Sequence, residues 1–281
     1  MLTCQESTLK TNDGKTLLTR HWPSGGPARA RLLLVHGFGE HSGRYPTLVE
    51  HLVRAQIDVH AFDHRGHGRS TGRRGHISDF SQYRDDVAAM LDSIVNRSPA
   101  LPIFLMGHSM GALIALDYLM HTPNPALKGA ILSGTPLEPT GAAGPVLIAL
   151  SRVMSRYLPA MRVKLGVQPE ALSRDSAVVE AYRNDPLVHG LASARWGTEM
   201  MDAMRRVNAS PQRLNVPTLF VHGGADTVSP PSAVHKFYQR LALKDKMLRV
   251  FDGCLHEPHN DPARTEEFPQ IAAWIEGHLS S

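Results

Sequence analysis

The chain has 281 residues, of which 42% are hydrophobic and 20% charged, and its formal net charge is +4. This composition excludes an intrinsically disordered chain and allows one α/β domain that carries an insertion. The basic residues are scattered and form no long block, so we expect an ordinary basic surface and no nucleic-acid partner. The two cysteines, Cys4 and Cys254, lie far apart and predict no disulfide framework.

Residues 1–15 are polar and contain no apolar signal core. No apolar run approaches the roughly 20 residues that are needed to span a bilayer. We therefore expect a soluble, cytoplasmic protein. A secreted protein whose leader has been removed would show the same sequence, so that alternative stays open.

Short apolar runs, several of them followed by glycine-containing turns, indicate buried strands. They cover 31–35, 57–62, 102–106, 127–132, 216–221 and 247–251. Apolar residues from Phe80 to Ile94 follow helical spacing after Ser78-Asp79, which can cap a helix. Asp261-Pro262 similarly predicts an N-cap followed by proline at the first position of the last helix. Strands alternating with helices predict a mostly parallel central sheet with helices on both faces, an α/β fold.

Residues 136–205 interrupt this alternation. They contain helical patches but no convincing strand. We therefore predict an α/β core formed by 1–135 and 206–281, and a helical cap, or lid, formed by 136–205. Ligands bind at the carboxyl edge of such sheets, so a cap over that edge would form the substrate pocket.

The segment Gly107-His108-Ser109-Met110-Gly111 matches the G-x-S-x-G nucleophile elbow. The glycines remove side chains that would clash in a tight strand-to-helix turn, which then presents the serine hydroxyl above the sheet. The pattern alone is weak, because an inert serine in a glycine turn would match it too. The buried strand before it and the helix-forming run 112–116 after it favour Ser109 as a nucleophile.

A nucleophilic serine needs a base and an orienting carboxylate, which follow it in the chain order Ser, acid, His in this template. Asp226 follows the strand 216–221, and His256 follows the strand 247–251. We predict that they complete a catalytic triad with Ser109. The rivals are Asp252 and Asp63 for the acid, although Asp63 precedes the serine, and His259 for the base.

The turn His36-Gly37-Phe38-Gly39 follows the first predicted strand and predicts an oxyanion hole. The backbone N–H groups of Phe38 and Met110 are its expected donors. Losing one such donor typically raises the reaction barrier by about 3 kcal/mol.

Residues 36–45, with the sequence HGFGEHSGRY, resemble the H-G-x-G-E-H-S-x-R-Y segment of the monoacylglycerol lipase and lysophospholipase group of α/β-hydrolases. Residues 63–70 and 72–75 are similar to its second signature, and 107–111 to its usual elbow. This group is also classed with the serine aminopeptidase-like hydrolases. The resemblance is strong from about 8 to 135 and from 214 to 281, and weak between them. It implies an α/β-hydrolase fold and cleavage of monoacylglycerols to fatty acid and glycerol.

The resemblance also implies a polar site for the glycerol part, formed by Glu40, Arg44, His108 and His259. For Glu40 and Arg44 the alternative is a structural pair that holds the first loop. Phe38 is bulkier than the alanine often found at its position, so its ring is expected to narrow the pocket.

No cofactor is expected. His60, Asp63, His64 and His67 do not match a known zinc spacing, and the glycines after 37 do not match a dinucleotide loop, so we predict no metal at the site. The expected partner is a small lipid ester. Lysophospholipase, general carboxylesterase, acyltransferase and peptidase activities remain alternatives, as does a non-catalytic small-molecule receptor with this fold. The sequence does not predict the oligomeric state.

The predicted cap carries apolar residues at helical spacing with basic residues between them. The apolar set is Val146, Leu147, Leu150, Val153, Met154, Tyr157, Leu158 and Met161, and the basic set is Arg152, Arg156, Arg162 and Lys164. An interfacial helix has this pattern. A cap helix packed on its own domain has it as well, so peripheral membrane contact through the cap is one of two open interpretations.

Overall fold

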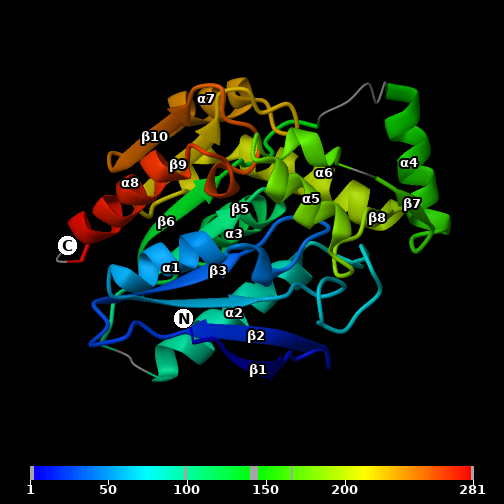
Figure 1. Cartoon of the computed structure of the whole chain (residues 1–281). Coiled ribbons are helices and arrows are strands. Elements are labelled where there is room, and N and C mark those ends of the chain that lie inside the picture. The colour runs from blue at the N-terminus through cyan, green and yellow to red at the C-terminus, as the bar shows by residue number, and fades with distance from the viewer. Residues whose placement is uncertain (1–2, 98–99, 140–144, 166, 280–281) are drawn as a thin grey trace.

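The computed structural model describes residues 3–97, 100–139, 145–165 and 167–279, with the backbone alone for 145–150. Its central feature is an eight-stranded sheet in the order β1-β2-β4-β3-β5-β6-β9-β10 (Figure 1). The strands β1 and β2 form an antiparallel hairpin, and β2 pairs antiparallel with β4. The other six strands of this sheet, β4, β3, β5, β6, β9 and β10, are parallel to one another. The strands are β1 (Gln5–Lys10), β2 (Thr16–Trp22), β3 (Ala30–Val35), β4 (Ile57–Phe62), β5 (Ile103–His108), β6 (Leu127–Ser133), β9 (Thr218–Gly223) and β10 (Lys246–Phe251).

Helices cover both faces of the sheet, because parallel strands that are apolar on both sides need cover on each. One core packs α1 and α8 against the sheet, and the other packs α2, α3, α6 and α7 against the opposite face. These helices are α1 (Pro46–Arg54), α2 (Ser81–Arg97), α3 (Met110–His121), α6 (Ala194–Ala209), α7 (Pro231–Arg240) and α8 (Arg264–Gly277). The predicted α/β fold is therefore confirmed.

The six predicted strands correspond to β3, β4, β5, β6, β9 and β10. The hairpin β1–β2 was not predicted. Its first strand, QESTLK, is polar and almost fully exposed, so it lacks the apolar alternation that marks a half-buried strand. The hairpin is held by its pairing with β4, a long-range contact that the local pattern does not show.

The structure confirms the predicted start of α2 but not that of α8. The Asp79 carboxylate accepts the Ser81 N–H at 2.8 Å just before α2, as a capping residue does. At the C-terminal helix the prediction was wrong, because α8 begins at Arg264 rather than directly after Asp261. The Asp261 carboxylate instead pairs with Arg174 and accepts the Ala263 N–H at 3.1 Å.

The chain between β6 and β9 lies at one end of the sheet (Figure 1). Before α6 it contains α4 (Pro145–Tyr157), β7 (Arg162–Lys164), α5 (Ser176–Asn184) and β8 (Leu191–Ser193). The strands β7 and β8 pair antiparallel, so the expectation of no strand here was wrong. Each has three residues, which is too short for a periodic pattern. The helix α6 continues through the predicted boundary at 205 to Ala209.

This inserted segment contacts the loops that follow the carboxyl ends of β3 and β4. The His189 N–H donates to the Gly39 carbonyl at 2.8 Å, and the Ser193 N–H donates to the Gly75 carbonyl at 2.8 Å. Short 3₁₀ helices, η1 (Ser42–Arg44), η2 (Pro169–Ala171), η3 (Pro211–Arg213) and η4 (Pro258–Asn260), complete the connections. In the part of the chain that the structure describes, no helix combines the length and apolarity needed to cross a membrane.

Two glycines give opposite predictions for stability. Gly197 lies inside α6, and a Cβ there would meet no atom within 4 Å, so Gly197→Ala should stabilise the protein by about 1 kcal/mol through helix propensity. Gly223 ends β9, and a Cβ there would lie 2.0 Å from the Leu255 carbonyl oxygen. We expect Gly223→Ala to destabilise the protein by roughly 1–3 kcal/mol. Urea unfolding of both variants measures this, and similar midpoints for the two would contradict it.

Candidate active site

Ser109 lies at the sharp turn between β5 and α3. Its backbone angles are φ 51° and ψ −121°, in the left-handed region that is unfavourable for a residue with a side chain. A Cβ at Gly107 would lie 2.4 Å from the Gly111 carbonyl oxygen, and a Cβ at Gly111 would lie 2.0 Å from the Val35 carbonyl oxygen. Both glycines are therefore required sterically, as the elbow pattern predicted.

The structure brings Ser109, His256 and Asp226 together in a hydrogen-bonded chain. His256 Nε2 lies 2.8 Å from Ser109 Oγ, and His256 Nδ1 lies 2.8 Å from Asp226 Oδ2. The other oxygen of Asp226 accepts the N–H groups of Val228 at 2.8 Å and Ser229 at 2.9 Å. These side chains follow β5, β10 and β9, so three carboxyl ends of parallel strands converge on one point. This is the geometry of nucleophile, base and orienting acid.

The loop after β3 lies against the serine. A Cβ at Gly37 would come 3.3 Å from Ser109 Cβ, and the Gly37 N–H is fixed by Glu40 Oε1 at 2.6 Å. Phe38 follows Gly37, and Met110 is the first residue of α3, so the Met110 N–H has no acceptor within its helix. The Phe38 ring packs against Trp196 of α6 with ring centroids 4.2 Å apart. The inserted segment therefore supports the loop that carries the expected oxyanion donor.

A buried guanidinium forms one wall of the site. Arg44 donates to Glu257 Oε1 at 2.7 Å and Oε2 at 3.0 Å, and to Glu40 Oε2 at 2.9 Å. Tyr45 donates its hydroxyl hydrogen to Glu40 Oε1 at 2.6 Å. The Arg44 guanidinium also lies over the Tyr182 ring, 4.6 Å from its centroid. Glu40 and Arg44 thus do pair and hold the first loop, which is the structural role considered for them.

The cavity beside Ser109 has a volume of about 30 Å³. Its lining combines the expected residues Phe38, Glu40, Arg44 and His108 with residues of the inserted segment. The full lining is Gly37, Phe38, Glu40, Arg44, His108, Ser109, Val167, Leu172, Tyr182, His256 and Glu257. His259 is not among them. It is fully buried behind this wall, stacked on Tyr45 at 4.5 Å and edge-on to His108 at 4.6 Å.

Comparison with known proteins places the chain in a family. The family model described as serine aminopeptidase, S33, matches residues 26–263. The chain belongs to the serine aminopeptidase S33 family. The resemblance in the sequence motifs is thereby confirmed.

Similar proteins with names match nearly the whole chain. A monoacylglycerol lipase of Mycolicibacterium smegmatis is 34% identical, over 92% of this chain and 92% of its own. A phospholipase of Bacillus subtilis, YtpA, is 31% identical, over 92% of this chain and 99% of its own. The crystal structure of a monoacylglycerol lipase of Paleococcus ferrophilus superposes with a TM-score of 0.82 at 33% identity, covering 99% of this chain and 100% of that one.

Within this S33 hydrolase site, burial and charge set the protonation of the triad residues. Burial alone would raise the pKa of Asp226, but His256, His222 and the Ser229 N–H bring it well below the usual value. Burial alone would lower the pKa of His256, but Asp226, Glu257 and Glu40 raise it above 6.5. Asp226 therefore stays ionised, which is the state that a carboxylate needs in order to stabilise a protonated imidazole beside it.

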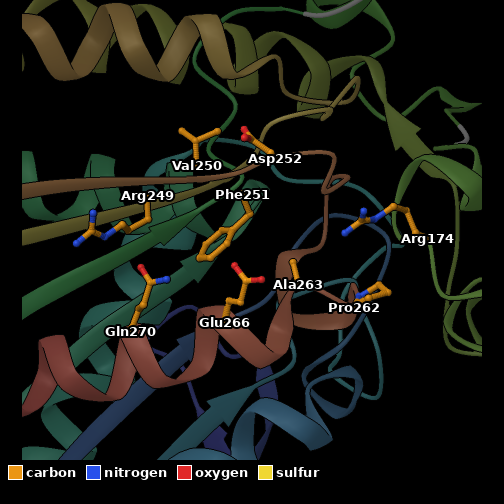
Figure 2. Close-up of a pocket in the computed structure, with 9 residues that line it drawn as sticks. All are labelled: Arg174, Arg249, Val250, Phe251, Asp252, Pro262, Ala263, Glu266 and Gln270. Carbon is orange, nitrogen blue, oxygen red and sulfur yellow. The ribbon is translucent and has the colours of Figure 1, made fainter.

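The three rival residues lie elsewhere. Asp252 is exposed and faces a separate pocket of about 710 Å³ between β10 and α8, which Figure 2 shows with Arg174 and Glu266 on its rim. Asp63 is buried in a different network, where Oδ1 accepts Arg20 Nη1 at 2.9 Å. His259 is held behind the cavity wall, so none of the three takes part in the Ser109 hydrogen-bond chain.

Two residues of this site were missed by the sequence analysis. Glu257 directly follows His256, and its position next to the predicted base could have drawn attention to it. Tyr182 lies in α5, in the segment without recognisable motifs, and no local signal pointed to it. Both reach the cavity through contacts with Arg44.

Replacing Asp226 tests the hydrogen-bond chain. Asp226→Asn should lower kcat by about ten-thousand-fold, because the amide favours the wrong imidazole tautomer and no longer stabilises its charged form. Asp252→Asn, which changes an exposed carboxylate outside the Ser109 hydrogen-bond chain, is the matched control and should leave kcat unchanged. Steady-state kinetics of the two variants provide the measurement, and equal rates would contradict the assignment.

The raised pKa of His256 predicts the acid limb of the pH–rate profile. Only the neutral imidazole accepts the serine proton, so kcat/KM should fall about tenfold per pH unit below this pKa. The midpoint should lie above 6.5. Glu257→Gln removes a negative charge that raises the pKa and should move the midpoint to lower pH. A midpoint below 6.5, or a shift to higher pH in the variant, would refute this prediction.

Proposed function

We propose that the protein hydrolyses the ester bond of monoacylglycerols through an acyl-enzyme on Ser109. The observation that carries this proposal is the Ser109–His256–Asp226 hydrogen-bond chain, which opens on a cavity with a charged polar wall. Relatives named monoacylglycerol lipase that match almost the full chain support the substrate class.

The geometry supports the following steps. His256 takes the proton of Ser109 as Oγ attacks the ester carbonyl, and the N–H groups of Phe38 and Met110 hold the oxyanion. The imidazolium then gives its proton to the leaving glycerol oxygen, which leaves an acyl-serine. Water activated by His256 attacks the acyl group and releases the fatty acid. The chain's own residues suffice for each step, so the mechanism requires no cofactor.

The charged wall is the proposed site of the glycerol part. Burial raises the pKa of Glu40 against the pull of Arg44, whereas Arg44 and Asn260 lower that of Glu257 to about 2 despite its burial. Burial, with the charges of Arg44 and His256, lowers the pKa of His259 to about 4. Burial likewise holds the pKa of His108 well below its usual value. The wall therefore combines fixed charges with the neutral imidazole of His108, a mixture that suits uncharged hydroxyl groups, and His259 lies buried behind it.

We propose that residues 136–205 act as a cap that must open for substrate. The cavity volume of about 30 Å³ is roughly a tenth of the lower end of ordinary ligand pockets. Val167, Leu172 and Tyr182 of this segment line the cavity together with Ser109. An acyl chain needs their displacement, and apolar residues of the opened cap would then line its path.

The same segment is the proposed membrane contact. Its exposed apolar side chains include Val153 at 53% and Tyr157 at 72% exposure, and Leu158, Met161, Val163 and Leu165 continue the set. The exposed cations Arg156, Arg162 and Lys164 are interleaved with them. This combination suits an interfacial surface that receives single-chain lipids. Of the other apolar residues expected here, Met154 is half-buried, and the side chains of Val146, Leu147 and Leu150 lie outside the described residues.

Lysophospholipid hydrolysis is the second candidate. The phospholipase YtpA, which the chain matches over nearly its full length, favours it, and both reactions use the same serine chemistry. A general carboxylesterase, the third alternative, would need no polar site for a headgroup.

A non-catalytic receptor is distinguished from these three enzymes by its serine. An unactivated serine would react poorly with a fluorophosphonate probe.

A substrate panel tests the proposal. It compares a monoacylglycerol series, a lysophospholipid, a triacylglycerol, a short p-nitrophenyl ester and a peptide amide, each with Ser109→Ala as the inactive control. Monoacylglycerols should have the highest kcat/KM. Turnover restricted to short activated esters would contradict the glycerol site and leave a general esterase.

The Glu40→Gln variant tests the polar wall itself. It keeps the side-chain shape but removes a charge, and we expect about a tenfold loss of kcat/KM for monoacylglycerol that exceeds the loss for a p-nitrophenyl ester. Glu266→Gln, which changes an exposed carboxylate on the rim of the separate pocket, is the matched control. Equal losses on both substrates would make Glu40 a purely structural residue.

Truncating the exposed cap face tests membrane contact. The double variant Val153→Ser and Leu158→Ser should lower activity on dispersed lipid by about a hundredfold, because each lost apolar side chain removes roughly 1.5 kcal/mol of interfacial burial. A soluble ester should be nearly unaffected. Met247→Ser changes an exposed apolar residue of β10 and serves as the control. Equal losses of activity on dispersed lipid and on the soluble ester in the double variant would contradict the interfacial role.

A further inference from the structure

Two histidines and an aspartate, side-chain types that can ligate a metal, lie together outside the Ser109 cavity, where β2 meets β4. His21 of β2 stands opposite His60 of β4, and their rings stack with centroids 4.2 Å apart and an interplanar angle of 2°. Asp58 precedes His60 by two residues, so both side chains point to the same face of β4. One ligand atom from each of the three residues falls within 4.8 Å of the others.

Hydrogen bonds orient the carboxylate of this cluster. Asp58 Oδ1 accepts the N–H of Ser24 at 2.8 Å and its hydroxyl at 2.8 Å. The second oxygen, Oδ2, faces His21 Nε2 at 3.5 Å. Such outer hydrogen bonds are what hold a ligating carboxylate in place at metal sites.

The hydrogen bonding of His21 leaves its Nε2 atom without a donor, and a cation could bind there. His21 Nδ1 lies 3.3 Å from the amide oxygen Oε1 of Gln5, an acceptor that the tautomer with its hydrogen on Nδ1 satisfies. The lone pair of Nε2 then faces the Asp58 carboxylate. Nε2 is buried and has no hydrogen-bond partner among the described residues. A nitrogen lone pair and an anionic oxygen in this arrangement repel each other unless a proton or a metal ion lies between them.

We propose that His21, Asp58 and His60 form a binding site for a divalent transition metal such as Zn²⁺, Ni²⁺ or Cu²⁺. Two imidazoles and one carboxylate are the ligand set that these ions accept, with water in the remaining positions. The His21 and Asp58 side chains are 23% and 20% exposed, so an ion can enter from solvent. On binding, the stacked rings tilt so that both lone pairs converge at about 2.0–2.1 Å from the metal.

The charge around the cluster limits the affinity. Arg31 is a buried cation near His60, but its guanidinium donates to the carbonyl of Ile94 at 2.6 Å and to that of Leu101. It competes with no ligand atom, yet its positive charge opposes a second cation nearby. A moderate affinity is therefore expected rather than that of a closed structural zinc site.

The position of the site defines its effect. The pairing of β2 with β4 is the antiparallel seam that joins the N-terminal hairpin to the parallel sheet (Figure 1). A metal bound to both strands would tie this seam and stabilise the folded chain by mass action. None of the three ligands lines the Ser109 cavity, so the metal is expected to change stability rather than the catalytic step.

The experiment uses the full chain stripped of metal with a chelator. Isothermal titration with ZnCl₂ and NiCl₂ should give about one equivalent per chain, and saturating metal should raise the melting temperature. Asp58→Asn keeps an acceptor for Ser24 but should weaken binding at least about tenfold, and His21→Asn and His60→Asn should weaken it further. His235→Asn, which removes an exposed histidine of α7, is the matched control and should bind like the wild type.

A measurement on the unmutated chain keeps the test independent of variant folding. Electron paramagnetic resonance with one equivalent of Cu²⁺ should show superhyperfine coupling to two imidazole nitrogens. The proposal is overturned if the wild type binds no stoichiometric metal, as expected when a proton fills the gap at His21. It is also overturned if the Asp58 and His60 variants bind like the wild type, or if His235→Asn removes the binding.

Discussion

The site depends on one steric constraint, the strained backbone of Ser109 between β5 and α3. Close approach of Gly107 to Gly111, and of Gly111 to the end of β3, leaves no room for a Cβ at either glycine. The Ser109 N–H donates to the Ser133 carbonyl of β6 at 2.8 Å, which fixes the turn from the other side. The buried helix α3 holds this conformation in place, so the packing of the core maintains the strain at the serine.

A second constraint joins the two halves of the site. Arg44 bonds Glu40 in the loop after β3 and Glu257 beside His256, so one guanidinium links the loop that contains Phe38 to the loop that contains His256. Burying three charges is costly unless each is paired and hydrogen-bonded, and here Tyr45, Asn260 and the Gly37 N–H complete the bonds. The same network adds negative charge near His256, which links the shape of the site to the basicity of its base.

Local patterns in the sequence predicted the elements whose signal is local. The buried strands β3 to β6 and the glycine elbow are each recognisable from a few consecutive residues. The chain order of serine, acid and histidine then indicated Asp226 and His256. Contacts between distant segments could not be predicted. The seam of β2 with β4, the support of Phe38 by Trp196 and the contact of Tyr182 with Arg44 all arise only after folding. Asp261 shows the same limit, because its carboxylate pairs with Arg174 of the inserted segment while it accepts the Ala263 N–H, and α8 begins only at Arg264.

The central claim is that Ser109 carries the acyl group of a monoacylglycerol. The direct measurement is mass spectrometry of the protein quenched in acid within the first turnovers on a monoacylglycerol of known chain length. The account predicts a mass increase equal to that acyl group minus one hydrogen, located on the peptide that contains Ser109 and absent from Ser109→Ala. Turnover that persists in Ser109→Ala, or an acyl adduct on another residue, would contradict it.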